Sequence, residues 1–108
     1  MQFQNPIPKR LKEARRKAGY SQKALGVQIG MDESSASGRM NHYEKGRHTP
    51  DLSTLKRIAE ELDVPLNYFF CEDDQIAEIV CLLDKLNDTN KEEVLCLIKQ
   101  LYKSHKTN

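Results

Sequence analysis

The fold of this chain is decided by residues 19–46, which read GYSQKALGVQIGMDESSASGRMNHYEKG. Ser21 stands where a helix needs an N-cap, and Gly30 closes the helix that follows it. A second helix begins beyond Gly30 and is capped by either Asp32 or Ser34. Two helices of about ten residues each, joined through a glycine-containing connection, predict a helix-turn-helix.

The second helix of this pair ends at Gly46 and has one apolar and one polar side. Ala36, Met40 and Tyr43 recur at i, i+4 and i+7, so we expect them to be buried together. At about 100° per residue, the opposite side carries hydrogen-bonding groups and no acids. Its residues are Ser34, Gly38, Asn41, His42 and Lys45, with Ser35, Ser37 and Arg39 beside them. A merely solvated helix more often includes Glu and Asp there, so this side indicates a binding surface.

Helical periods continue on both sides of this pair, and no strand-like alternation occurs. A first helix is predicted over Lys9–Lys17, a fourth helix is capped by Asp51, and a short fifth helix spans Pro65–Phe70. The apolar residues of these helices are expected in the core: Leu11, Ala14, Ala18, Leu52, Leu55, Ile58, Ala59, Leu62, Leu66, Phe69 and Phe70.

Beyond the acidic hinge at 71–74, two further amphipathic helices are predicted. Residues 87–90 separate them, and Thr89 with Glu92 has the spacing of a capping box for the last helix. The apolar stripes are Ile76, Ile79, Val80, Leu83 and Leu86, then Val94, Leu95, Ile98, Leu101 and Tyr102. This hairpin has more apolar surface than it can bury in itself, so it docks either on the N-terminal domain or on another chain.

The predicted fold is therefore all-α, with two parts. Residues 1–70 form a five-helix helix-turn-helix domain, and residues 71–108 form a C-terminal helical hairpin. The charge is also unevenly distributed along the chain, although the whole chain has a net charge of only +1. Residues 1–50 contain ten Lys or Arg and four Asp or Glu, a net charge of +6, and the remainder has −5. A basic first half indicates a side that faces a polyanion.

Several classes of protein are disfavoured by what the sequence lacks. It has no run of about 18 apolar residues, as a membrane span needs, and no signal-peptide pattern, so we expect a cytoplasmic protein. The cysteines form no CxxC pair, and we expect buried, reduced thiols at Cys71, Cys81 and Cys96. We expect no enzyme, cofactor or metal site. The chain lacks phosphate-loop, HExxH and nucleophile-elbow motifs, and His42, His48 and His105 do not share metal-ligand spacing with the cysteines.

An ordered set of short motifs runs through a little over half of the chain: Leu11-Lys12-Glu13-Ala14-Arg15, Gly19-Tyr20-Ser21-Gln22, Leu25, Gly30, Tyr43-Glu44-Lys45-Gly46, Pro50, Leu55, Ile58-Ala59, Leu62 and Val64-Pro65. With these motifs, the stretch from Arg10 to Phe70 resembles the phage-repressor helix-turn-helix family, also called the Cro or xenobiotic-response-element type. The resemblance implies that the second helix of the motif enters the major groove of DNA.

The resemblance also implies particular contacts with duplex DNA. Gln22 matches the family's glutamine that bonds a backbone phosphate, and Ser37, Gly38 and His42 fall where the family reads bases. By their chemistry, Arg39 suits guanine or phosphate and Asn41 suits adenine. Lys45, Arg47 and His48 lie in the loop where the family contacts phosphates. The candidate DNA-binding residues are thus Gln22, Ser35, Ser37, Gly38, Arg39, Asn41, His42, Lys45 and Arg47.

Two further points follow from the resemblance. Arg15 and Glu44 correspond to a family pair that bonds the first helix to the end of the third, a structural role. The chain also has about four more residues between Gly30 and Tyr43 than the commonest family spacing, which is about one helical turn. Either the third helix begins a turn early near Asp32, or the connection is a longer, serine-rich loop.

The sequence thus predicts a sequence-specific transcriptional regulator, a repressor that binds a palindromic operator as a homodimer, with residues 71–108 as the dimerisation element. The alternative is an antitoxin-like module. In that case the C-terminal helices would bind a protein partner, and DNA binding would be secondary.

Overall fold

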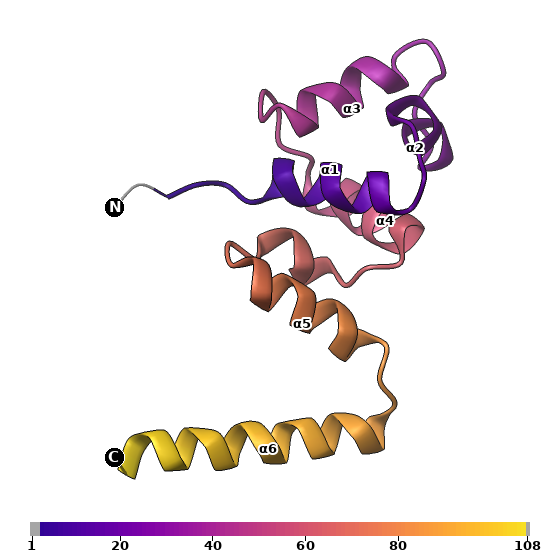
Figure 1. The fold of residues 1–108 in the computed structure, drawn as a ribbon. Helices are drawn as coiled ribbons and strands as arrows, with labels where there is room; N and C mark the ends of the chain where they lie inside the picture. The colour runs from indigo at the N-terminus through magenta and orange to yellow at the C-terminus, as the bar shows by residue number, and fades with distance from the viewer. Residues whose placement is uncertain (1–2, 108) are drawn as a thin grey trace.

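The structure, a computed structural model, describes residues 3–107. In chain order the elements are α1 (Ile7–Lys17), α2 (Gln22–Gln28), α3 (Ala36–Glu44), α4 (Leu52–Leu62), the 3₁₀ helix η1 (Leu66–Phe70), α5 (Asp74–Asp84) and α6 (Asp88–Thr107) (Figure 1). The described residues contain no β-strand, so the predicted all-α fold is confirmed. Met1, Gln2 and Asn108, at the outer ends of the two expected parts, lie outside the described residues.

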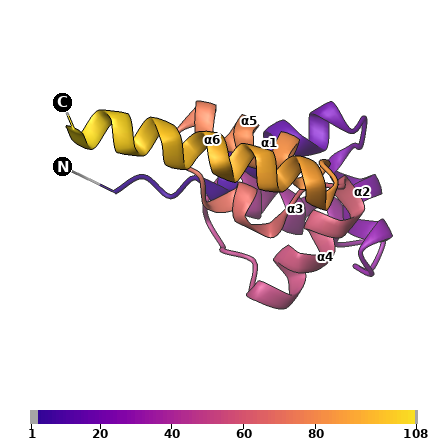
Figure 2. The same cartoon turned by 90° about the horizontal axis from the view of Figure 1, so that it is seen from below.

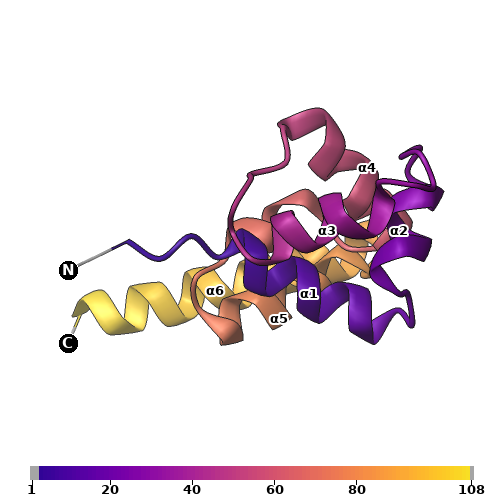
Figure 3. The same ribbon diagram turned by 90° about the horizontal axis from the view of Figure 1, so that it is seen from above.

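The apolar core lies between α1, α2, α3, α4 and η1. The predicted inner face of α3 is confirmed, because Ala36, Met40 and Tyr43 are all buried. Helix α3 lies beside α1 and α2 (Figure 3). Gly26 of α2 faces Ala36, and a Cβ atom added at Gly26 would lie 2.8 Å from the Ala36 Cβ. Carbon atoms in favourable contact are about 3.5–4.0 Å apart, so the close approach of α2 and α3 requires glycine at this position.

The predicted caps of α2 and α4 are confirmed. The Ser21 hydroxyl accepts a hydrogen bond from the backbone N–H of Ala24 (3.0 Å), and the Asp51 carboxylate accepts one from Thr54 (2.8 Å). The bond from the backbone of Thr54 is also the main reason why the pKa of Asp51 is lowered. Each cap satisfies a backbone donor that a helix start would otherwise leave without a partner.

Two predicted helix starts in the first domain are wrong. Helix α1 begins at Ile7 rather than Lys9, because proline is tolerated in the first turn of a helix and the earlier start buries Ile7. The predicted fifth helix is the 3₁₀ helix η1, with Pro65 at its N-cap position and Leu66 as its first residue. Three expected core residues are exposed because they lie at helix ends: Ala18, Leu52 and Phe70.

The predicted capping box of the last helix is also wrong. Helix α6 begins at Asp88, and the side chain of Asn87 accepts a hydrogen bond from the backbone N–H of Asn90 (2.8 Å). Thr89 therefore lies inside the helix. An Asn side chain caps a helix start at least as well as Thr does, so the helix begins directly after Asn87.

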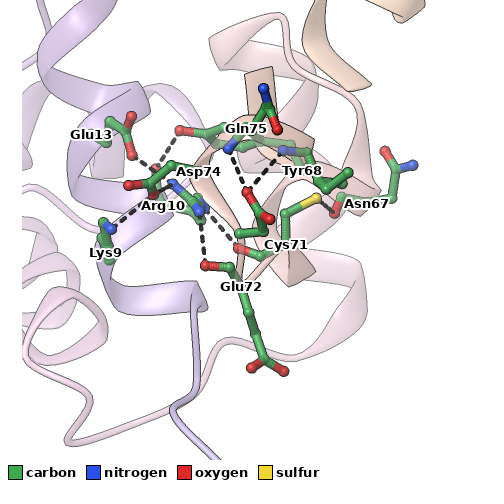
Figure 4. A network of polar contacts seen from close by, with 11 residues as sticks. Lys9, Arg10, Glu13, Asn67, Tyr68, Cys71, Glu72, Asp74 and Gln75 are labelled. Atoms are coloured by element: carbon green, nitrogen blue, oxygen red, sulfur yellow. Dashed lines mark hydrogen bonds and ion pairs between the residues drawn. The ribbon is translucent and has the colours of Figure 1, made fainter. Parts of the chain in front are cut away.

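Helix α5 is held on the first domain by Arg10, a charged side chain that is only 1% exposed (Figure 4). Its Nε donates to the carbonyl oxygen of Cys71 (2.8 Å), and its Nη2 donates to that of Glu72 (3.3 Å). Its Nη1 forms ion pairs with Glu13 (3.1 Å) and Asp74 (2.9 Å). Burial alone lowers the pKa of Arg10, but the bonds to Asp74 and Glu13 outweigh it and the pKa is raised. Arg10 thus joins α1 to the start of α5.

The first half of the predicted hairpin docks on the N-terminal domain, which was one of the two alternatives. Ala77 of α5 is buried in the core, and Val80 and Cys81 pack against it. At the other end of α5, Lys85 forms an ion pair with Asp63 beyond α4 (2.6 Å). Both ends of α5 are therefore tied to the first domain.

Helix α6 differs from α5, because none of its described side chains is buried. Figure 1 shows it as a separate rod beyond the end of α5, and Figure 2, seen from below, shows it running across the front of the molecule. Cys96 on α6 is exposed, and Cys71 and Cys81 are only half-buried, so the prediction of buried thiols is wrong, although all three are free.

Candidate nucleic-acid interface

The outward side of α3 is polar and open to solvent. Ser37, Gly38 and Arg39 are exposed, and Asn41 and His42 are half-buried. Glu44 is the single acid of α3, and its side chain is buried. This side therefore presents hydrogen-bonding groups of the kind that read base edges, and no negative charge that nucleic-acid phosphates would repel.

The extra residues before α3 form a turn, which decides between the two alternatives for this segment. Helix α3 begins at Ala36, and Ser35 occupies its N-cap position without a side-chain capping bond, so neither Asp32 nor Ser34 caps it. The Ser34 hydroxyl donates to the Asp32 carboxylate (2.5 Å) and the Ser35 hydroxyl to the Asp32 carbonyl (3.3 Å). The serines thus close the turn around Asp32 instead of extending the helix.

The end of α3 is tied to α1 by a buried ion pair. Arg15 and Glu44 form a bidentate contact, with Nε–Oε2 at 2.5 Å and Nη2–Oε1 at 3.0 Å. Their side chains are 10% and 2% exposed. Arg15 also donates to the carbonyl oxygen of Tyr20 (2.8 Å), in the connection between α1 and α2. The pair therefore joins the end of α3 to α1 and to the connection that precedes α2.

Gln22, at the start of α2, extends this network to the outward side of α3. Its Nε2 donates to Glu44 Oε1 (3.1 Å) and to Asn41 Oδ1 (3.2 Å). Both Nε2 hydrogens are thus engaged within the protein, and the expected phosphate contact requires Gln22 to release one of them. The sequence contains no signal for these bonds, because they join positions 19 and 22 residues apart.

The basic residues that follow α3 are exposed. Lys45, Arg47 and His48 lie in the turn that Gly46 allows, and the backbone N–H of Arg47 bonds to the carbonyl oxygen of His42 (2.9 Å). The rings of His42 and His48 lie edge to face, with centroids 5.1 Å apart. The turn is therefore packed back on the end of α3, beside the outward side.

Residues 1–50 present less positive charge at the surface than their sequence suggests. Arg10 and Arg15 are buried and paired within the protein, and Lys23 forms an ion pair with Glu33 (3.2 Å). By contrast, Arg39, Lys45 and Arg47 are exposed.

The part of the chain that the structure describes contains no group of three or more His, Cys, Asp or Glu side chains placed to hold a metal ion. Among the described residues, no helix has both the length and the apolar character that a bilayer crossing requires.

The close packing of α2 on α3, with an exposed polar side on α3, defines a helix-turn-helix protein of the phage-repressor type. The family described as "Helix-turn-helix domain" matches residues 9–72. The chain is similar to the HTH-type transcriptional regulator ImmR of Bacillus subtilis (strain 168), with 35% identity over 68 residues, which are 63% of this chain and 50% of ImmR. The match thus spans half the length of this relative.

A solved structure is similar over almost the whole chain. The crystal structure of the transcriptional regulator BswR superposes with a TM-score of 0.84 and 45% sequence identity, covering 91% of this chain and 97% of BswR. The chain belongs to the helix-turn-helix transcriptional regulators of the phage-repressor type.

Proposed function

We propose that this protein is a sequence-specific repressor, acting in the cytoplasm, that binds a palindromic operator as a homodimer. The observation that carries the proposal is the exposed, acid-free side of α3, which a buried network holds at a fixed angle. In this proposal the protein is a binding module without a catalytic step.

The proposed contacts divide into two kinds. Arg39, Asn41, His42 and Ser37 of α3 read base edges, and Gly38 lets the backbone of α3 approach the groove closely. The phosphates are bound by side chains around the helix, which set the register without reading sequence: Gln22, Ser35, Lys45 and Arg47. Arg15 and Glu44 hold α3 in place and do not contact DNA.

The bond from Gln22 refines the proposal for Asn41. Because Asn41 Oδ1 accepts from Gln22, Asn41 offers its Nδ2 hydrogens as donors. Asn41 Oδ1 has a second lone pair, so it can still accept from the N6 amino group of adenine while Nδ2 donates to N7. We therefore expect Gln22 to hold the Asn41 amide in one orientation, in which it can pair with adenine.

Selection of bound duplexes from random DNA tests the proposed function directly. We expect an enriched palindrome whose half-sites are about 34 Å apart, one turn of DNA, because each subunit inserts one α3. If no sequence is enriched and no duplex is bound at low salt, the proposal is wrong.

Replacing Arg39 with Ala is expected to weaken binding to the selected operator by about 1–3 kcal/mol and to leave binding to a scrambled duplex almost unchanged. The reason is that Arg39 is assigned to a base edge. Fluorescence anisotropy with both duplexes measures the difference, and Arg16→Ala, an exposed arginine on α1, is the matched control. Equal losses on both duplexes would make Arg39 a phosphate contact.

Replacing Lys45 with Ala is expected to weaken binding to all duplexes alike and to reduce the slope of log K against log salt by about one unit. Each phosphate that a lysine neutralises releases counterions, so the salt dependence counts such contacts. A titration at several salt concentrations gives the slope, and Lys56→Ala on α4 is the control. An unchanged slope for Lys45→Ala would remove Lys45 from the interface.

A further inference from the structure

Helix α6 carries an apolar stripe that nothing covers in the single chain. Leu95, Ile98, Leu101 and Tyr102 are 46%, 52%, 61% and 59% exposed. They recur at helical spacing with Ile98 at the centre, so they form one continuous side of the rod. An apolar stripe of this length on a soluble protein marks an interaction surface.

The charges of α6 are segregated along its length. The first half carries Asp88, Glu92 and Glu93 against a single base, Lys91, whereas the second half, from Ile98 onward, carries lysines and no acid. This order agrees with the helix dipole, and it also makes the two halves of α6 electrostatically complementary to each other.

We propose that α6 pairs with α6 of a second copy of this chain in an antiparallel arrangement, with the two-fold axis near Ile98. The acidic half of each helix then lies along the basic half of its partner, and the two apolar stripes cover each other. The inference rests on the proposed function, of which dimerisation is a part, and it supplies the orientation of the two subunits.

The edge of the stripe favours this orientation over a parallel one. Asp88, Glu92, Lys99 and Lys106 lie on the same edge at about 100° per residue. In an antiparallel pair, like edges of the two helices meet, so Lys106 lies opposite position 90 of the partner, between the partner's Asp88 and the partner's Glu92. In a parallel pair, the charged edge of one helix would instead meet the opposite edge of the stripe on the second helix. That opposite edge holds the uncharged residues Asn90, Leu97 and Ser104.

Two structural features agree with the pairing. The Lys106 Nζ lies 5.4 Å from the centroid of the Tyr102 ring, which keeps this charge beside the stripe. Figure 1 shows α3 and α6 at opposite ends of the molecule, so pairing through α6 leaves the outward side of α3 uncovered.

Sedimentation of the full chain tests the surface. Ile98→Asp places a charge at the two-fold axis and is expected to weaken dimerisation at least about 100-fold, giving a monomer. The matched control is Cys96→Asp, which adds the same charge on the opposite side of α6 and is expected to remain a dimer. Far-UV circular dichroism shows that both variants are folded. A monomeric native chain, or a dimer that Ile98→Asp does not weaken, overturns the proposal.

Disulfide cross-linking tests the orientation. Lys91→Cys and His105→Cys are each made in a Cys96→Ser background, whose own oxidation gives the baseline. In the antiparallel pair, the two copies of position 91 lie about 21 Å apart along the axis, because they are separated by about 14 residues of helix rise. Neither variant should therefore cross-link with itself, whereas a mixture of the two should cross-link, because position 91 faces position 105 of the partner.

The outcomes separate the proposals. Self-cross-linking of both variants means a parallel pair, and no cross-linking in the mixture means another interface; either result overturns the antiparallel arrangement. Binding of the native chain to duplexes selected from random DNA is measured independently. A failed orientation therefore leaves the proposed DNA-binding function standing, and a failed selection leaves the cross-linking result interpretable.

Discussion

Replacing Glu44 with Gln is expected to lower the free energy of unfolding by about 3–5 kcal/mol, because the Arg15 guanidinium would then be buried without its counter-charge. The Glu44 side chain is 2% exposed and accepts hydrogen bonds from Arg15 and Gln22. Because the site is buried, water cannot solvate the Arg15 guanidinium in place of the carboxylate. Urea unfolding measured by circular dichroism gives the change.

The control for Glu44→Gln is Glu33→Gln, which removes an ion pair with Lys23 whose side chains are more than half exposed. We expect that variant to lose less than about 1 kcal/mol. A double variant, Arg15→Met with Glu44→Met, should recover much of the stability, since apolar residues often replace a buried pair without loss. A loss below about 1 kcal/mol for Glu44→Gln alone would contradict the assigned structural role.

Replacing Arg10 with Met is expected to lower the free energy of unfolding by about 2–4 kcal/mol and to loosen α5. Methionine fills a similar volume but donates no hydrogen bond, so the carbonyl oxygens of Cys71 and Glu72 lose their partner. Burial raises the pKa of the Cys81 thiol on α5, so Cys81 should be labelled slowly in the native chain and faster in the variant.

The matched control for Arg10→Met is Lys9→Ala. Lys9 also pairs with Asp74 (2.9 Å), but its side chain is 63% exposed, so this change should cost less than about 0.5 kcal/mol. Urea unfolding measures the stability of both variants, and mass spectrometry after alkylation identifies the labelled cysteine. If the two variants were equally stable, Arg10 would not be the residue that holds α5.

The helix-turn-helix was predictable from local signals. A cap at Ser21, a stop at Gly30 and the i, i+4, i+7 spacing of Ala36, Met40 and Tyr43 act within one or two helical turns, and sequence order displays them directly. The same logic predicted the outward side of α3, because a helix that buries one side must expose the other. Assignment of these residues to bases or phosphates stays a prediction.

Contacts between distant segments were not predictable in the same way. Arg10 looked like one of many bases in the first half of the chain, yet it is the buried residue that binds the start of α5. Gly26 carried no turn signal, and its role is the close approach of α2 to Ala36. A long-range contact depends on the angle at which two helices cross, and that angle follows from all of the side chains packed between them.

The amino-acid order by itself determined that this protein is all-helical, that α2 and α3 form the motif, and that α3 has a polar side, because helix periodicity and capping are local properties. Only the tertiary structure decided that α5 docks on the first domain while α6 does not. It also decided that Gln22 bonds to Asn41 and that Glu44 pairs with Arg15. The physical reason is that burial and hydrogen-bond partners across a core are properties of the packed whole, in which each side chain competes with its neighbours for the same space.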